Sequence, residues 1–206
     1  MIYLILSAII SYLVGSISSA IIISKTFYDT DIRKTGSKNA GATNTLRAFG
    51  KKAGATVFIF DFSKGLLCAL AAKYLVYFLN APYECVLVAG FFVQLGHIFP
   101  LFFKFKGGKG VATAAGAALA IMPAAACILL GLFAVIIALT KTVSLASGIC
   151  AAVYPLLALF RSGANASANF VFAATCAVMI AVKHAPNFAR LLDGEEKKIS
   201  FKRKKE

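Results

Sequence analysis

The sequence is poor in acidic residues, histidines and paired cysteines, and each shortage excludes a class of protein. Only 8 Asp and Glu stand against 22 Lys and Arg, so the formal net charge is +14. The 2 histidines and 5 cysteines show no CxxC pair and no zinc-ligand spacing, which argues against a disulfide framework and a zinc site. The GxSxG nucleophile elbow and the GxxxxGKS/T phosphate loop are absent as well. We therefore expect neither a metal nor a cofactor.

The chain is instead rich in apolar residues, which make up 60% of it at a mean hydropathy of +0.81. A soluble domain is about half apolar, so this excess indicates an integral membrane protein. The basic residues lie between and after the apolar runs. They therefore indicate membrane topology and lipid headgroups as partners rather than nucleic acid. The cysteines lie in or beside the same runs, where they serve as small buried hydrophobes.

The apolar runs are long enough for membrane helices, which need about 20 residues each. The first run lacks the basic start of a signal peptide, so we expect it to remain as a transmembrane helix. The runs are Ile2–Ser24, Ala53–Leu79, Cys85–Phe103, Val111–Leu139, Val143–Phe160 and Ala168–Val182.

The run Val111–Leu139 exceeds one span and contains Pro123, so it forms either one kinked helix or two short ones. A split near Met122–Pro123 gives seven spans and leaves all basic residues except Lys64, Lys73 and Arg161 on the cytoplasmic side. A single crossing would put the basic C-terminal tail outside. We therefore predict an all-α integral membrane protein with seven transmembrane helices, the N-terminus outside and the C-terminus cytoplasmic. Residues 1–196 form one transmembrane domain in this prediction, and residues 197–206 form a basic cytoplasmic tail.

The first polar loop, GSKNAGATN, interrupts the apolar pattern with small residues, hydroxyls and amides. Small residues let backbone N–H groups approach a ligand, and Thr43 or Asn44 is suited to cap a short helix beginning near Thr45. Helix N-termini attract anions, and Arg47 follows one turn later. The segment is therefore either a phosphate cradle or an ordinary connecting loop.

The second polar loop, FKFKGGKG, places Lys106 and Lys109 around paired glycines. A basic loop that only sets the topology explains the lysines. It does not explain Gly107, Gly108 and Gly110, which cost backbone entropy unless a close approach or an unusual dihedral is required. We therefore favour a phosphate-binding role for this loop.

The third polar segment carries His184, Asn187 and Arg190, which share one helical face if the helix continues past Pro186. The other histidine, His97, lies near the end of the third apolar run. A lone histidine at a membrane interface is more often structural. A polar stripe beside two basic loops favours ligand contact.

Asp61 and Lys64 lie inside the second apolar run at a spacing of i and i+3. Charges in a span are expensive and usually pair or serve function. We expect an intrahelical ion pair, with a role in orienting the site as the alternative.

Four motifs together resemble the bacterial membrane-integral glycerol-3-phosphate acyltransferases of the PlsY type. They are GSKNAGATNTLR, the DxxKG of Asp61–Gly65, GHIFPLFFKFKGGKGVAT and KHAPNFARLLDGEE, and they extend over essentially the whole chain. The HxxxxD motif of other glycerolipid acyltransferase families is absent. The resemblance implies acyl transfer from acyl-phosphate to the first hydroxyl of glycerol 3-phosphate. The products are lysophosphatidic acid and phosphate, in the first step of phospholipid synthesis.

The resemblance also implies a seven-span monomer in the bacterial inner membrane, with its active site on the cytoplasmic side. The enzyme that produces acyl-phosphate is the protein partner it suggests. It assigns catalytic roles to Ser37, Arg47, His184 and Asn187. It assigns substrate binding to Gly36, Asn39, Gly41, Thr43, Asn44, Lys106, Gly107, Gly108, Lys109, Ser144, Arg190 and Glu195.

Within these roles, the first loop holds the phosphate of acyl-phosphate, while Arg47 and a lysine of the second loop bind glycerol 3-phosphate. Glu195 supports the loops. Whether Lys106 or Lys109 meets substrate, and whether His184 is a base or a binder, stays open.

An organic-phosphate transporter is the competing function, because it also needs basic glycine loops. A transporter site lies near the bilayer midplane and draws polar residues from both faces. In the predicted topology the polar segments collect on one face, and no internal repeat is evident. A membrane scaffold would need none of these polar motifs. We therefore favour the acyltransferase.

Overall fold

The computed structural model describes residues 1–160 and 163–199, and within these ranges the chain forms helices and loops but no β-strand. Residues 200–206 of the predicted tail, and Arg161 of a predicted outer loop, lie outside the described residues. The elements are α1 (Ile2–Gly15), α2 (Ser19–Tyr28), η1 (Ile32–Lys34), α3 (Ala42–Phe49), α4 (Lys51–Leu79), α5 (Glu84–Ile98), η2 (Leu101–Phe103), α6 (Val111–Ile121), α7 (Pro123–Thr140), α8 (Val143–Leu159) and α9 (Ala166–Leu192).

Five segments of the described chain are long and apolar enough to cross a membrane. They are Ile2–Tyr28, Lys51–Leu79, Glu84–Phe103, Pro123–Thr140 and Ala166–Leu192. The helices α6 and α8 are apolar but shorter. The prediction of an all-α membrane protein is thus confirmed in its class.

The long fourth run breaks where its proline predicts. α6 ends at Ile121 and α7 begins at Pro123, which occupies the first turn of the new helix. Proline fits there because its missing N–H would have no partner in the first turn, and its fixed φ suits a helix start. The run therefore forms two helices rather than one kinked helix.

The first apolar run also forms two helices, although its hydropathy predicts a single span. α1 ends at Gly15 and α2 begins at Ser19. A side chain at Gly15 would lie 2.2 Å from the carbonyl oxygen of Val93, so its glycine lets α1 pack against the backbone of α5. The carbonyls freed at the break accept hydrogen bonds from Lys64 Nζ, which lies 3.1 Å from Gly15 O and 3.0 Å from Ile17 O.

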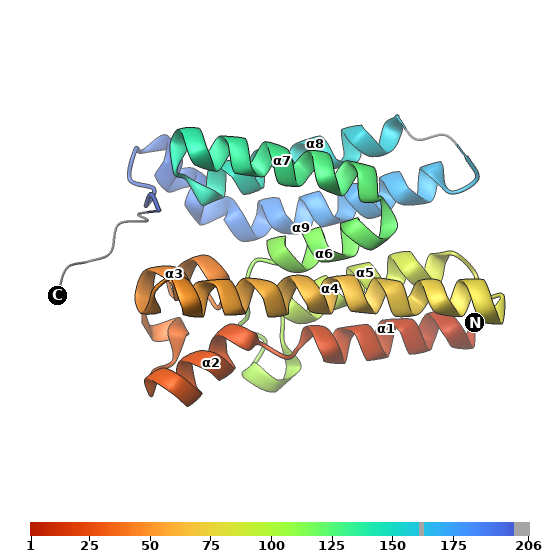
Figure 1. Ribbon diagram of the computed structural model, residues 1–206, viewed down its shortest axis with the longest axis horizontal. Coiled ribbons are helices and arrows are strands. Elements are labelled where there is room, and N and C mark those ends of the chain that lie inside the picture. The colour runs from red at the N-terminus through yellow and green to blue at the C-terminus, as the bar shows by residue number, and fades with distance from the viewer. Residues whose placement is uncertain (161–162, 200–206) are drawn as a thin grey trace.

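The long helices run roughly parallel or antiparallel in a flattened bundle (Figure 1). In this view α1, α4 and α5 form one layer, α7, α8 and α9 form the other, and α6 lies between them. The short helix α3, the turn between α7 and α8, and the last turns of α9 gather at one end of the bundle. The N-terminus lies at the opposite end. Polar segments from the first loop, the turn between α7 and α8 and the C-terminal part of the described chain thus meet at a single end.

Small residues fill the contacts between helices, and large apolar side chains point outward. Side chains added at Gly65 and Gly116 would each lie 2.0 Å from a carbonyl oxygen of the facing helix, so α4 and α6 pack backbone to backbone. In contrast, Ile9, Phe60 and Val178 are more than half exposed. This arrangement suits lipid, where close packing of small residues holds helices together.

Candidate active site

The first polar loop is shaped by Asn44, which is buried at 1% exposure. Its side-chain oxygen accepts a hydrogen bond from Ser37 N at 2.9 Å. Its side-chain nitrogen donates to the carbonyls of Ile32, Thr35 and Asn39 at 3.2, 2.9 and 3.0 Å. Asn44 therefore fastens both arms of the loop to the start of α3.

This geometry corrects the predicted cap of the short helix. α3 begins at Ala42 rather than near Thr45, and its N-cap is Gly41, which has no side chain to cap with. Asn44 lies within the first turn and bonds backward to the loop. Gly36 is required beside it, because its φ is +60° and a side chain there would lie 2.4 Å from Asn44 Oδ1.

The second polar loop packs against the end of α5. Gly107 N donates to Ile98 O at 3.2 Å, and Gly108 N donates to His97 O at 3.1 Å. A side chain at Gly107 would lie 2.1 Å from His97 O, and one at Gly108 would lie 2.1 Å from His97 Nε2. These glycines therefore let the loop pack closely against His97, which is the kind of close approach that their presence predicts.

The two lysines of this loop differ in their surroundings. Lys106 is exposed. Lys109 turns inward, where its Nζ donates to Asn187 Oδ1, and it lines a cavity together with Asn187 and His184. Of the two candidates, Lys109 is the one positioned to meet a ligand.

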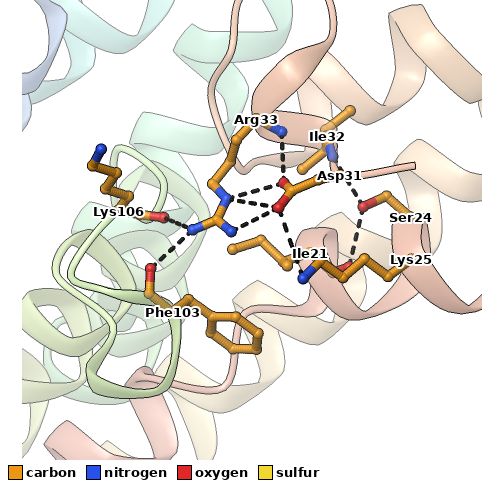
Figure 2. A network of polar contacts seen from close by, with 8 residues as sticks. All are labelled: Ile21, Ser24, Lys25, Asp31, Ile32, Arg33, Phe103 and Lys106. Atoms are coloured by element: carbon orange, nitrogen blue, oxygen red, sulfur yellow. Dashed lines mark hydrogen bonds and ion pairs between the residues drawn. The ribbon is translucent and has the colours of Figure 1, made fainter. Parts of the chain in front are cut away.

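An ion pair fastens the chain before the first loop to the second loop (Figure 2). The guanidinium of Arg33 bonds both carboxylate oxygens of Asp31 and donates to Phe103 O at 2.9 Å. Hydrogen bonding from Arg33 outweighs burial and lowers the pKa of Asp31 to about 2, and the same contact raises the pKa of Arg33. No motif in the sequence indicated this connection.

The helix α9 continues past Pro186 to Leu192, so the condition for a shared polar face is met. His184 and Asn187 are both buried and line the cavity. His184 Nδ1 lies 2.9 Å from Ile180 O. A carbonyl only accepts, so this contact places the proton on Nδ1 and leaves Nε2 as an acceptor in the neutral ring.

Glu196, and not the predicted Glu195, joins the loops from the tail side. Its carboxylate accepts from Ser144 Oγ at 3.0 Å, Asn187 Nδ2 at 2.7 Å and Arg190 Nε at 3.0 Å, and its side chain is only 5% exposed. Burial opposes its ionisation, but these hydrogen bonds prevail and lower its pKa. Glu195 is exposed. Two adjacent glutamates carry no pattern that tells which one turns inward.

Residues 197–199 continue along the same side of the cavity. Arg47 donates to Lys197 O at 2.6 Å, and Ile199 N donates to Lys141 O at 2.8 Å. Ile199 is buried and lines the cavity. The start of the predicted tail thus packs onto the folded chain.

Together these segments enclose a cavity of about 450 Å³. The predicted site residues that line it are Ser37, Asn39, Gly41, Thr43, Asn44, Arg47, Lys109, Ser144, His184 and Asn187. Those that do not are Gly36, Lys106, Gly107, Gly108, Arg190 and Glu195. The residues that line it without having been proposed for the site include Lys51, Phe58, His97, Phe133, Ser147 and Glu196.

The electrostatics of the cavity favour an anion. Burial lowers the pKa of Lys109 to about 8, with Arg190, Arg47 and Lys183 adding to the effect and Glu196 opposing it. Burial also lowers the pKa of Arg47, which stays charged at neutral pH. Arg47 Nε is buried without a hydrogen-bond partner in the described part of the chain. A phosphate would supply the missing acceptor and the compensating negative charge.

The cavity also has an apolar side, formed by Leu46, Phe58, Val111, Phe133 and Val143. These residues come from α3, α4, α6, α7 and α8, so the apolar surface extends from the polar end into the helical bundle. A ligand with a charged head and a hydrocarbon tail fits such a division.

Comparison with known proteins gives one consistent result. A family model described as glycerol-3-phosphate acyltransferase matches residues 5–194. The glycerol-3-phosphate acyltransferase of Thermoanaerobacter sp. (strain X514) is 41% identical over 201 residues, which cover 97% of this chain and 98% of that protein. The crystal structure of PlsY (YgiH), an integral membrane glycerol 3-phosphate acyltransferase, in its glycerol 3-phosphate form has a TM-score of 0.87 at 35% identity and 96% coverage of both chains. Its lysophosphatidic acid form has a TM-score of 0.82 at 36% identity, covering 96% of this chain and 95% of that one.

Proposed function

Because the chain belongs to the glycerol-3-phosphate acyltransferase family, we propose that it uses acyl-phosphate as its donor. In this proposal the acyl group passes to the first hydroxyl of glycerol 3-phosphate, and the products are lysophosphatidic acid and phosphate. One observation carries it. A single cavity combines a glycine-rich loop at a helix N-terminus, a separate cluster of cations and an apolar side. Two phosphates and one hydrocarbon chain account for all three.

The donor phosphate binds at the first loop. Ser37, Asn39 and Thr43 line the cavity there, and the N-terminus of α3 faces it through Gly41 and Ala42. Helix N-termini and exposed backbone N–H groups favour phosphate. The acyl chain then lies along the apolar side of the cavity.

Glycerol 3-phosphate binds beside it, with its phosphate held by Arg47 and Lys109. Ser144 and Asn187 complete this subsite, and Glu196 fixes their orientation through its hydrogen bonds. Cations in a partly buried site bind phosphate more strongly than cations in water.

In the reaction, the hydroxyl oxygen attacks the acyl carbonyl carbon, and the bond from that carbon to the phosphate oxygen breaks. The hydroxyl proton passes to a phosphate oxygen, and inorganic phosphate leaves. The donor is already an activated mixed anhydride, so positioning of the two substrates supplies much of the rate. Cations stabilise the charge that develops on the leaving phosphate.

We assign His184 the role of binding and orienting the acceptor through Nε2. Its Nδ1 donates to Ile180 O, so Nε2 is the ring nitrogen left to contact the acceptor. His184→Ala should raise the KM for glycerol 3-phosphate and leave substantial turnover at saturation. Complete loss of turnover with normal binding would identify His184 as the base instead.

The proposal includes a topology in which all seven helical segments cross a bacterial inner membrane: α1 with α2, then α4, α5, α6, α7, α8 and α9. The N-terminus is outside, and the site faces the cytoplasm. Residues 1–196 are one domain of a monomeric enzyme, the basic tail contacts lipid headgroups, and the acyl-phosphate-producing enzyme is a candidate partner. Cysteine-accessibility labelling from each side of sealed vesicles tests the orientation.

The decisive experiment is a two-substrate assay on the purified protein in detergent. Phosphate release should require both acyl-phosphate and glycerol 3-phosphate. Acyl-CoA and acyl-carrier protein serve as alternative donors in parallel reactions. If one of these replaces acyl-phosphate, the proposed donor is wrong. If glycerol 3-phosphate enters protein-containing liposomes without any acyl donor, a transporter function has to be considered again.

A further inference from the structure

A buried charged cluster lies beneath the two phosphate-binding loops and has no part in the proposed chemistry. Its centre is the carboxylate of Asp61 on α4, which is 2% exposed. Asp61 Oδ1 lies 3.0 Å from Lys64 Nζ, 3.0 Å from Ser19 Oγ and 3.4 Å from His97 Nδ1. The expected intrahelical ion pair is therefore present, but it belongs to a larger assembly.

The lysine of this cluster is fully engaged in structural contacts. An ammonium group has three donors, and those of Lys64 face Asp61, Gly15 O and Ile17 O. Lys64 thus compensates the Asp61 charge and satisfies the backbone where α1 ends. It does not line the cavity, whereas Asp61 and His97 do. The part of the cluster that reaches the site is Asp61 with His97.

His97 stands where the two loops meet. A side chain added at Gly108 would lie 2.1 Å from His97 Nε2 and 2.7 Å from Ala40 O of the first loop. Both His97 and Ala40 are buried, at 5% and 0% exposure. The ring therefore fills the space beneath Gly108, and Lys109 follows directly in the chain.

We propose that Asp61 and His97 are positioning residues for Lys109. Asp61 lies 3.4 Å from the Nδ1 side of the imidazole ring, in an electrostatic contact without hydrogen-bond geometry. The opposite edge of the ring supports Gly108, so that Lys109 reaches Asn187 and the acceptor phosphate. The expected effect of Asp61 and His97 on substrate binding rests on the proposed function of Lys109. Their expected effect on the position of the Lys109 side chain is independent of that function.

The consequence is measurable on Lys109 itself. In the intact protein this amine is partly buried and faces Arg47 from α3, Lys183, His184 and Arg190 from α9, and Glu196. If the loop loses its support, the amine moves toward water and its pKa rises from about 8 toward the value of about 10.4 for an exposed lysine. Mass spectrometry of Lys109 after pulse labelling with an amine-selective acylating reagent gives this midpoint without any enzyme assay.

The main variant is Gly108→Ala, and Gly131→Ala is its matched control. Gly131 lies in α7 with open space around it, so its added methyl group meets nothing. Gly108→Ala should move the labelling midpoint of Lys109 upward and raise the KM for glycerol 3-phosphate about 10- to 100-fold, because small displacements of positioning groups have effects of this size. The kcat should change less. Gly131→Ala should change none of the three.

Two further variants connect this effect to the cluster. Asp61→Asn keeps the shape of the side chain but removes its charge, and it should shift both readouts in the same direction as Gly108→Ala. The double variant His97→Ala/Gly108→Ala removes the imidazole ring that the methyl group added at position 108 would otherwise strike. If both act through one contact, the double variant should be no worse than the poorer single variant.

The possible results separate the two proposals. An unchanged Lys109 midpoint together with an unchanged KM in Gly108→Ala would overturn the positioning role, as would fully multiplicative effects in the double variant. A wild-type protein inactive with acyl-phosphate would overturn the proposed donor only. The labelling experiment would still decide whether His97 and Asp61 position Lys109.

Discussion

The titration of Lys109 gives the most specific test of the acceptor site. Its pKa of about 8 means that the protonated fraction is about nine-tenths at pH 7 and about one-tenth at pH 9. The phosphate of glycerol 3-phosphate has its second pKa at about 6, so the substrate stays dianionic between pH 7 and pH 9. If only the ammonium form binds the phosphate, kcat/KM should fall about tenfold between pH 7 and pH 9.

The sign follows from the charge of the amine. Below pH 8 Lys109 is cationic and attracts the phosphate, and above pH 8 it is neutral and contributes only a hydrogen bond. The kcat should depend less on pH, because bound phosphate restores the positive charge and raises the pKa of Lys109 in the complex.

The assay is initial-rate phosphate release from acyl-phosphate at several acceptor concentrations, corrected at each pH for spontaneous donor hydrolysis. Lys109→Arg is the matched variant, because a guanidinium keeps its charge throughout this range. Its kcat/KM should be lower than that of the wild type at pH 7 but nearly independent of pH up to 9. A wild-type profile that stays flat to pH 9, or an equal decline in Lys109→Arg, would refute the assignment.

Further predictions concern the remaining contacts of the site. Ser37→Ala should abolish phosphate release from acyl-phosphate, and a variant of unchanged activity would remove the phosphate cradle. Glu196→Gln should raise the KM for glycerol 3-phosphate about tenfold or more, because charge-assisted hydrogen bonds contribute roughly 1.5–3 kcal/mol each. Glu195→Gln changes the exposed neighbour and should keep wild-type kinetics. Equal effects of the two variants would contradict the role assigned to Glu196. Arg33→Met should lower the thermal unfolding midpoint in detergent relative to Lys34→Met, and identical midpoints would show that the connection between the loops adds no stability.

Several features of this protein follow from local sequence alone. The apolar runs indicate a helical membrane protein, because lipid admits only segments that satisfy their own backbone. Pro123 identifies the break between α6 and α7, because a missing N–H and a fixed φ act on the adjacent residues. The glycines of the two loops indicated close approach. The four motifs resembled the family that sequence and structural comparison then confirmed.

Other features depended on residues far apart in the chain. Lys109 and Lys106 look alike in the sequence, and only the packing of the second loop on α5 turns one inward. Glu196 rather than Glu195 is selected by Ser144 and Asn187, which lie on α8 and α9.

The tertiary structure also decided what the small and amide residues do. Asn44 fastens the first loop because carbonyls from Ile32 to Asn39 surround it, a role that helix-capping preference did not suggest. Gly108 is required by the ring of His97. Hydropathy and proline affect the structure of neighbouring residues, so their consequences can be predicted from a short stretch of sequence. The direction of a side chain is set by partners that the sequence brings together only when the helices pack.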